Sequence, residues 1–167
     1  MLKYSRCQHL VYTVNSAEDE SQLSCAKDGG VINTGATSGA LSPDSQRAQD
    51  HAEKYYESVR NRRGDVERIA EHTGFSIGVI KAIKDHVFTN EHRFADGRIE
   101  RFTPDYEQSQ AWQRLENGSH TEDDIVFLRH ELSELRLMQN GVVYETAHEQ
   151  ANTEFNWQEI VLAKRKE

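Results

Sequence analysis

The chain has 167 residues, a net charge of −8 and a mean hydropathy of −0.81. This length suits one domain with a small appendage at most. No run approaches the roughly 18 apolar residues that a membrane-spanning helix needs, and no basic segment followed by an apolar stretch indicates a signal peptide. We therefore expect no membrane span, and secretion only within a larger polypeptide or by another route.

The charge is unevenly distributed along the chain. Residues 104–167 carry 6 Lys/Arg and 13 Asp/Glu, whereas residues 51–103 carry 10 and 9, together with four histidines. Because phosphate contacts supply most of the affinity for nucleic acid, the acidic third is a poor surface for it. The middle third is the region suited to a polyanion, and the acidic third suits a basic partner or simple solubility.

The first 44 residues differ in composition from the rest. Gly29-Gly30 and the small, polar run 34–39 are typical of linkers, and residues 9–14 could form a short strand. Both cysteines, Cys7 and Cys25, lie in this segment without a zinc-binding spacing. A disulfide and two free thiols both stay open.

Helices are predicted from apolar residues at helical spacing, and their ends from capping residues and glycines. Asp96-Gly97 between alternating segments predicts a two-residue turn, and therefore a hairpin over residues 92–102. Thr103-Pro104 is expected to supply the N-cap and first residue of the next helix, and Thr121 with Asp124 forms a capping-box pattern. The helices are expected at about 45–62, 65–73, 76–87, 104–115, 121–140 and 143–163, the last with a break near 152–153. The predicted fold is a mostly α, compact bundle of about six helices with one β-hairpin.

The run 127–135 places an imidazole and two carboxylates on a helix that is apolar on two sides. Such a helix is usually interior, and ionisable groups in it need partners, a metal or a catalytic role. His130-Glu131-Leu132-Ser133-Glu134 resembles the zinc-peptidase pattern His-Glu-x-x-His, with Glu134 in place of the second histidine. Three interpretations stay open: a metal site completed by His148 or Glu149, a metal-free catalytic or substrate-contacting site, and a buried structural His–Glu pair.

Two further groups of residues suit chemistry on a phosphate. His51 and Arg60 share one predicted helix, and metal-free phosphodiester cleavage needs a histidine to move a proton and an arginine to neutralise charge. Aromatic packing with a snorkelling arginine is the alternative. The second group, near the hairpin, could bind an anion or form a solvated charged surface. Its members are Lys84, His86, His92, Arg93, Arg98 and Arg101.

The region from about residue 51 to 157 contains a series of motifs. They are His51-x3-Tyr55-Tyr56-x2-Val59-Arg60, Thr73-Gly74-Phe75-Ser76, Lys84-Asp85-His86-Val87-Phe88, Arg101-Phe102-x-Pro104-Asp105, Ser109-Gln110-Ala111-Trp112-Gln113-Arg114-Leu115, His130-Glu131-x2-Glu134 and Ala147-His148. In these motifs the block resembles the C-terminal toxin domain of bacterial polymorphic and contact-dependent toxins. It is similar as well to C-terminal extensions of phage head-morphogenesis proteins. The Val-Glu-Asn-Asn junction typical of contact-dependent inhibition toxins is absent, which leaves the delivery system open.

The resemblance implies an antibacterial toxin domain at the C-terminus of a larger delivery protein. Such a domain acts in the cytoplasm of the target cell and is neutralised by a cognate immunity protein. Residues 1–44 would then be a linker or the tail of a delivery region, and residues 45–167 the helical toxin domain. The reaction is predicted from the residues, and a nuclease that favours RNA is the leading hypothesis.

In this nuclease a histidine would be the general acid or base, two arginines would stabilise the phosphate, and a carboxylate would orient a histidine or act as the base. The expected catalytic residues are His51, Arg60, His86, Arg101, His130, Glu131 and Glu134, with substrate contacts from Lys84, His92 and Arg98. This hypothesis predicts either no cofactor or an unknown one, and metal dependence stays open. One alternative is a zinc-dependent hydrolase or peptidase with His130, Glu134 and His148 as ligands. The other is a non-enzymatic phage head module that binds a partner through its acidic third.

Overall fold

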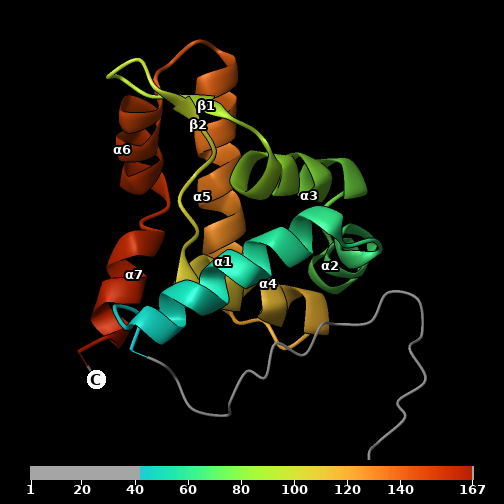
Figure 1. Ribbon diagram of the computed structural model, residues 1–167. Helices are drawn as coiled ribbons and strands as arrows, with labels where there is room; N and C mark the ends of the chain where they lie inside the picture. The colour runs from blue at the N-terminus through green and yellow to red at the C-terminus, as the bar shows by residue number, and fades with distance from the viewer. Residues whose placement is uncertain (1–41, 167) are drawn as a thin grey trace, which may run out of the picture.

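The computed structural model describes residues 42–166, which form seven α-helices, one π-helix and one β-hairpin (Figure 1). In chain order the elements are α1 (Gln46–Asn61), α2 (Asp65–Thr73), α3 (Ile77–Lys84), the π-helix η1 (Asp85–Thr89), β1 (His92–Arg93), β2 (Ile99–Glu100), α4 (Tyr106–Asn117), α5 (Glu122–Gln139), α6 (Tyr144–Glu154) and α7 (Trp157–Lys164). The predicted mostly α bundle with one hairpin is confirmed. Residues 1–41 lie outside the described residues, and with them the predicted strand at 9–14, the cysteines Cys7 and Cys25, and most of the predicted linker.

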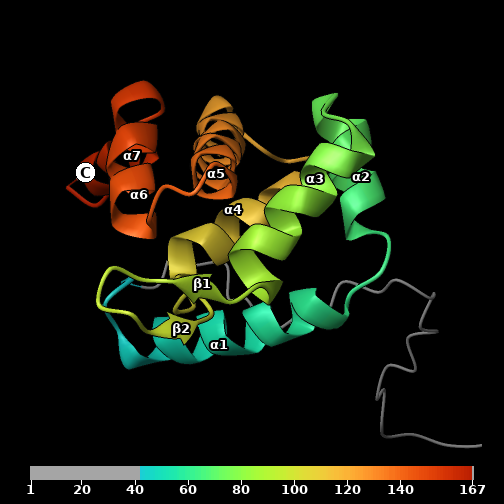
Figure 2. The ribbon, with the colours of Figure 1, turned by 90° about the horizontal axis from the view of Figure 1, so that it is seen from above.

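Helix α5 is the central element of the bundle. It packs against α6 and α7 on one side and against α3 on the other, and α4 also contacts it (Figures 1 and 2). The predicted capping box is present, with Thr121 and Asp124 each bonding the other's backbone. Phe127 and Leu128 of α5 are fully buried in the core. The prediction that this helix lies in the interior is therefore confirmed.

The apolar core lies between α5 and the four helices that precede it in the chain. Its largest fully buried side chains include Trp112, Tyr55, Tyr56, Phe88 and Phe127. Full burial of one large apolar side chain stabilises the folded state by about 1.5–3 kcal/mol. This core holds α5 rigidly, and with it the polar residues that α5 carries.

The third predicted helix ends earlier than expected. Helix α3 stops at Lys84, and η1 follows it, with the backbone N–H of Asn90 donating to the carbonyl of Asp85. Such π-helical segments are rare in proteins overall, but those that occur are often found at functional sites. In η1 the three successive residues His86, Val87 and Phe88 are all buried, a pattern that an amphipathic α-helix does not produce. The local change of helix type thus buries an imidazole among core side chains.

Three predicted boundaries were wrong in detail. The N-cap of α4 is Asp105, whose side chain accepts from the backbone N–H of Gln108, so Thr103 is not the cap. The last predicted helix breaks at Phe155 and Asn156, three residues later than expected. The hairpin loop has three residues instead of two, because Phe94 and Arg98 form its last bonded pair and Gly97 adopts a φ of 88°.

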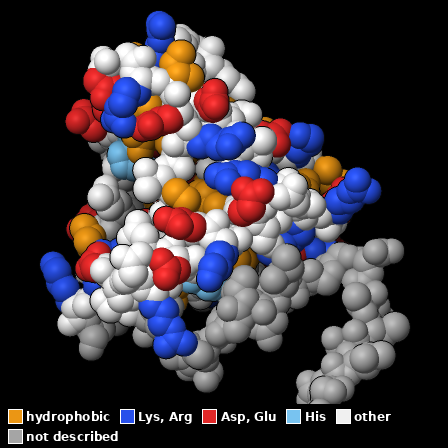
Figure 3. All heavy atoms as spheres, viewed as in Figure 1, with side chains coloured by type: hydrophobic (Ala, Val, Ile, Leu, Met, Phe, Trp, Pro, Cys, Tyr) orange, Lys and Arg blue, Asp and Glu red, His pale blue; other side chains and the backbone are white. Residues whose placement is uncertain are grey.

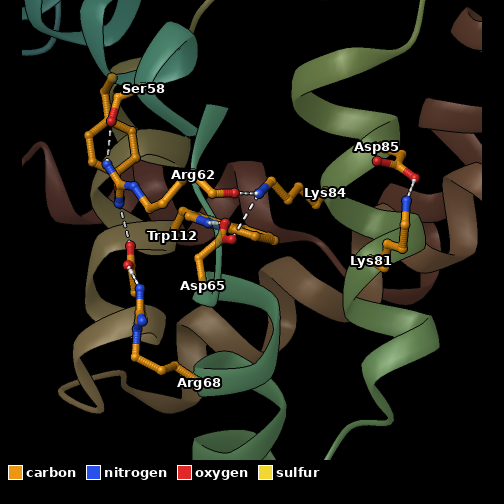
Figure 4. A network of polar contacts seen from close by, with 10 residues as sticks. Ser58, Arg62, Asp65, Arg68, Lys81, Lys84, Asp85 and Trp112 are labelled. Atoms are coloured by element: carbon orange, nitrogen blue, oxygen red, sulfur yellow. Dashed lines mark hydrogen bonds and ion pairs between the residues drawn. The ribbon is translucent and has the colours of Figure 1, made fainter. Parts of the chain in front are cut away.

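A buried network of charged side chains joins α1, α2, α3 and α4 (Figure 4). Lys84 donates to Asp65 at 2.8 Å and to the carbonyl of Arg62 at 2.9 Å. The indole of Trp112 donates to the second oxygen of Asp65 at 3.2 Å. Buried charges need such partners, because an isolated one is strongly destabilising. Lys84, expected to contact substrate, is therefore engaged in holding helices together.

Among residues 42–166, no helix has both the length and the apolar character required to cross a membrane.

Candidate metal centre

Five ionisable side chains from three elements meet beside α5. Helix α5 supplies His130, Glu131 and Glu134, η1 supplies His86, and α6 supplies His148. The four residues from α5 and η1 are buried, whereas His148 is partly exposed. On α5, His130 and Glu134 are four residues apart and therefore share the helix face that turns toward α6. Glu131 follows His130 directly and lies beside this pair. The structure thus brings His130, Glu134 and His148 together, the set named by the zinc hypothesis.

The carboxylate of Glu134 is the centre of this cluster. Its Oε2 lies 2.8 Å from Nδ1 of His148 and 3.7 Å from Nε2 of His130. Its Oε1 lies 2.9 Å from Nε2 of His86. The two imidazoles on the Oε2 side are also close to each other, with 3.3 Å between Nε2 of His130 and Nδ1 of His148. Three nitrogens therefore converge on one carboxylate.

His130 is held in the tautomer that a metal ligand requires. Its Nδ1 lies 3.0 Å from the carbonyl oxygen of Phe155, at the break between α6 and α7. A carbonyl can only accept, so Nδ1 carries a proton. In the neutral ring, Nε2 then holds the lone pair and faces the cluster. Metal-binding histidines characteristically donate their second N–H to such an acceptor. The residue at the helix break thus sets the chemistry of His130.

Two overlapping groups of ligand atoms fit divalent cations. The first contains His130, Glu134 and His148, and the second contains His86, Glu131 and Glu134, with the atoms of each group within 4.8 Å of one another. Nitrogen and carboxylate oxygen are both ligands of zinc, and three protein ligands with an open position are typical of catalytic zinc sites. The donor set of the first group fits such an ion.

The charge states of the two α5 carboxylates differ. Burial raises the pKa of Glu131 well above its usual value, and the neighbouring Glu134 and Asp105 raise it further. For Glu134, burial would raise the pKa, but the imidazoles of His130, His148 and His86 hold it below its usual value. The contact with Glu134 in turn raises the pKa of His148. Glu134 is therefore the carboxylate that stays ionised, and it favours positive charge beside it.

Glu131 is oriented by a chain of hydrogen bonds from α4 and α1. The side-chain amide of Gln108 donates to Oε1 of Glu131 at 3.3 Å. The hydroxyl of the buried Tyr56 donates to the amide oxygen of Gln108. This chain leaves Oε2 of Glu131 facing His86, at 3.9 Å from its Nε2.

The cluster opens into a cavity of about 400 Å³ between the hairpin, α5, α6 and α7. Aromatic side chains form much of its wall, and those are Phe94, Phe102, Tyr144 and Trp157. Tyr144 lies against His148, with ring centroids 5.6 Å apart. The cavity is large enough for a small ligand or one residue of a polymer.

The other sequence-predicted residues lie in different places. His51 packs on Tyr55 and lies 3.2 Å from the side-chain amide of Gln110, outside the cavity lining. Arg60 and Arg101 donate to the backbone carbonyls of Phe88 and Thr89, also outside the cavity. The two expected phosphate-binding arginines therefore do not join His86 and His130.

The hairpin residues occupy the wall and rim of the cavity. His92 is buried, stacks on Phe102 with 4.1 Å between centroids, and lies 2.8 Å through Nε2 from the carbonyl oxygen of His86. Burial lowers the pKa of His92, which favours its neutral form. Arg98 lines the cavity but is exposed and paired with Asp96 and Glu100. His92 thus supports His86, and Arg98 is the only Lys or Arg among the described residues lining this cavity.

Sequence reasoning missed Gln108, Tyr144 and Phe155. Each acts through tertiary position: an amide on the facing helix, an aromatic ring on the next helix and a carbonyl at a helix break. No spacing pattern indicates such contacts. The helix break predicted near residue 152 was the one pattern that pointed toward the carbonyl of Phe155, because helix ends expose carbonyl groups.

Comparison of the chain with protein-family models, curated proteins and solved structures gave no match. The function is therefore inferred from the residues of the site.

Proposed function

We propose that this protein is a metal-dependent hydrolase whose cation is held by His130, Glu134 and His148. The observation that carries the proposal is the convergence of Nε2 of His130, Nδ1 of His148 and Oε2 of Glu134, with the tautomer of His130 set by Phe155. A structural His–Glu pair needs no such tautomer, whereas a ligand does.

The charge of the cavity also favours a metal over metal-free catalysis. Hydrolysis of an ester or phosphodiester develops negative charge that hydrogen-bond donors or a cation stabilise. Arg98 is exposed and already paired, and four carboxyl groups line the same cavity. They are Glu100, Asp105, Glu131 and Glu134. A divalent cation in the ligand set would supply the missing positive charge and lower the pKa of a water molecule.

The residues around the ligand set have roles that follow from their contacts. Glu131 lies beside the set, where it can hold the attacking water or share its proton, and Gln108 orients it. Tyr144 can donate a hydrogen bond toward substrate, since burial raises the pKa of its hydroxyl and keeps it protonated. The aromatic wall offers faces on which an unpaired base can stack.

For substrate we propose the phosphodiester of a single-stranded nucleic acid, with RNA favoured, in keeping with the toxin resemblance. Figure 3 shows acidic and basic side chains interspersed over one face, without a large area of one sign. On this face, local contacts with substrate are favoured over long-range attraction. In this proposal the protein is an effector delivered to a target cell and neutralised by an immunity protein. A peptide substrate is the competing outcome of the same assay.

The test is cleavage by purified protein after treatment with a chelator. Total RNA, single-stranded and double-stranded DNA and casein are incubated with the protein, with and without added Zn²⁺ or Mn²⁺. We expect metal-dependent cleavage of RNA that His148→Ala abolishes and His51→Gln retains. Cleavage unaffected by chelator would overturn the metal role, and cleavage of casein alone would overturn the nuclease assignment.

The effector role is tested separately in living cells. Expression in the bacterial cytoplasm should arrest growth, and His130→Ala, checked for folding by circular dichroism, should relieve the arrest. Arrest that persists with folded His130→Ala would instead favour a non-enzymatic binding module.

A further inference from the structure

The carboxylate of Glu134 presents its two oxygens to different imidazoles. Oε2 faces His148 at 2.8 Å and belongs to the first ligand set, while Oε1 faces His86 at 2.9 Å. On the Oε1 side, Oε2 of Glu131 lies 3.9 Å from the same nitrogen of His86. A second group of potential ligands, all three buried, therefore shares Glu134 with the first.

We propose that His86, Glu131 and Glu134 bind a second divalent cation, so that Glu134 bridges two ions. The inference rests on the proposed hydrolase function and specifies its reaction centre. Paired metals in nucleases and phosphatases stand about 3.5–4 Å apart and stabilise the attacking and the leaving oxygens of a displacement. The two oxygens of one carboxylate can support two ions at that spacing.

The buried pair of carboxyl groups offers ligands to a second cation. Glu131 and Glu134 lie side by side at 3% and 2% exposure, and both can ionise there only beside compensating positive charge. A cation in the first set compensates Glu134 alone. Gln108 gives Glu131 one neutral hydrogen bond, on Oε1, and leaves Oε2 directed at His86. A cation between Glu131 and His86 would allow this second carboxyl group to ionise and serve as a ligand.

The two sites should differ in affinity. Nδ1 of His130 is supported by the carbonyl of Phe155, whereas Nδ1 of His86 is buried without a hydrogen-bond partner within residues 42–166. Loss of such a supporting partner typically weakens metal binding by about 10–100-fold. The second ion should therefore bind at least about 10-fold more weakly than the first.

The proposal is tested by the stoichiometry of Zn²⁺ binding. The full chain carries Cys7→Ser and Cys25→Ser, so that thiols do not add sites, and is treated with chelator before calorimetric titration and native mass spectrometry. We expect two ions per chain, one tight and one weaker. His86→Ala and Glu131→Gln should each bind one ion with the tight affinity retained, and His148→Ala should lose the tight class.

A second readout reports the distance between the ions. Two Mn²⁺ ions joined by a carboxylate give an exchange-coupled electron paramagnetic resonance signal, which Glu131→Gln should convert to that of an isolated ion. Because Glu131→Gln preserves the shape of the side chain and removes only its ability to act as a carboxylate ligand, it tests the second site even if His86→Ala fails to fold.

The outcomes separate the two proposals. One tight ion in the parent chain, lost in His148→Ala and unaffected by Glu131→Gln, overturns the second cation and leaves the hydrolase proposal standing. Two ions that both survive Glu131→Gln also overturn it. No bound ion in the parent chain overturns both proposals.

Discussion

Replacing Glu134 by glutamine should abolish the stabilisation that metal gives to the fold. A ligand that binds only the folded state stabilises it by about 2.7 kcal/mol when its free concentration is about 100 times Kd. Unfolding entropy scales with length, so for the described 125 residues each kcal/mol shifts Tm by about 4 °C. One saturated site should thus raise Tm by about 10 °C. Because Glu134 supplies a ligand to both groups, Glu134→Gln should show almost none of this rise.

The measurement is thermal unfolding by circular dichroism with and without Zn²⁺, in the Cys7→Ser, Cys25→Ser background. Glu116→Gln is the matched control, because Glu116 is equally buried but lies away from the cavity, bound to Arg62 and Arg68. The control should lower Tm in chelator and keep the full rise with Zn²⁺. A rise that survives in Glu134→Gln would refute the assignment of Glu134 as a ligand.

Three further predictions concern stability, pH and positioning. Glu116→Ala leaves the buried guanidinium of Arg62 without its carboxylate and should lower the free energy of unfolding by about 3–5 kcal/mol. Arg68→Ala, at a side chain 34% exposed, should lower it by under about 1 kcal/mol. Urea unfolding of both variants measures these changes, and equal changes would contradict the reasoning. The pKa of His148 is raised by Glu134, so its contribution to stability is complete below about pH 6.5 and is lost as pH rises through the folded-state pKa. The Tm of chelator-treated protein should therefore fall as pH rises above about 6.5. His148→Gln should flatten that slope, and an unchanged slope would count against the pair. Gln108→Ala should lower kcat by about 10-fold or more, because Glu131 loses the hydrogen bond that orients it. KM and the affinity of the first site for Zn²⁺ should stay unchanged, since Gln108 does not contact the first ligand set. A lower affinity at the first site would contradict this role.

The central helix could be predicted from sequence in both position and character. Its apolar residues occupy two sides of a helical wheel, which requires burial, and the polar stripe between them contains His130 and Glu134 at i,i+4. Local spacing determines which side chains share a helix face, and this is why the pair was identifiable. Spacing alone allowed either His148 or Glu149 to complete the set, and the zinc hypothesis chose His148. The packing of α6 on α5 places His148 beside Glu134.

The rest of the site depends on contacts that no local pattern encodes. The π-helix that buries His86 arises after α3, where the sequence predicted a continuous α-helix. Arg60 and Arg101 carry the charge expected at a phosphate site, but each donates to a backbone carbonyl near the end of η1. Their charge alone predicted a phosphate site, but in the folded protein both arginines form hydrogen bonds with the backbone instead.

The break between α6 and α7 links the fold to the chemistry of the site. The carbonyl of Phe155 accepts from the backbone N–H of Trp157 at 2.8 Å as well as from His130. A continuous helix over residues 144–164 would point this carbonyl along the helix axis, and Nδ1 of His130 would lose its acceptor. His130 could then present either nitrogen as a donor, and its lone pair would no longer be committed to the cluster. The break thus serves two purposes: it lets α7 turn toward the core, where Trp157 packs on Phe127 with 4.9 Å between centroids, and it fixes the tautomer of the ligand. An irregularity that weakens one helix therefore organises the proposed metal centre.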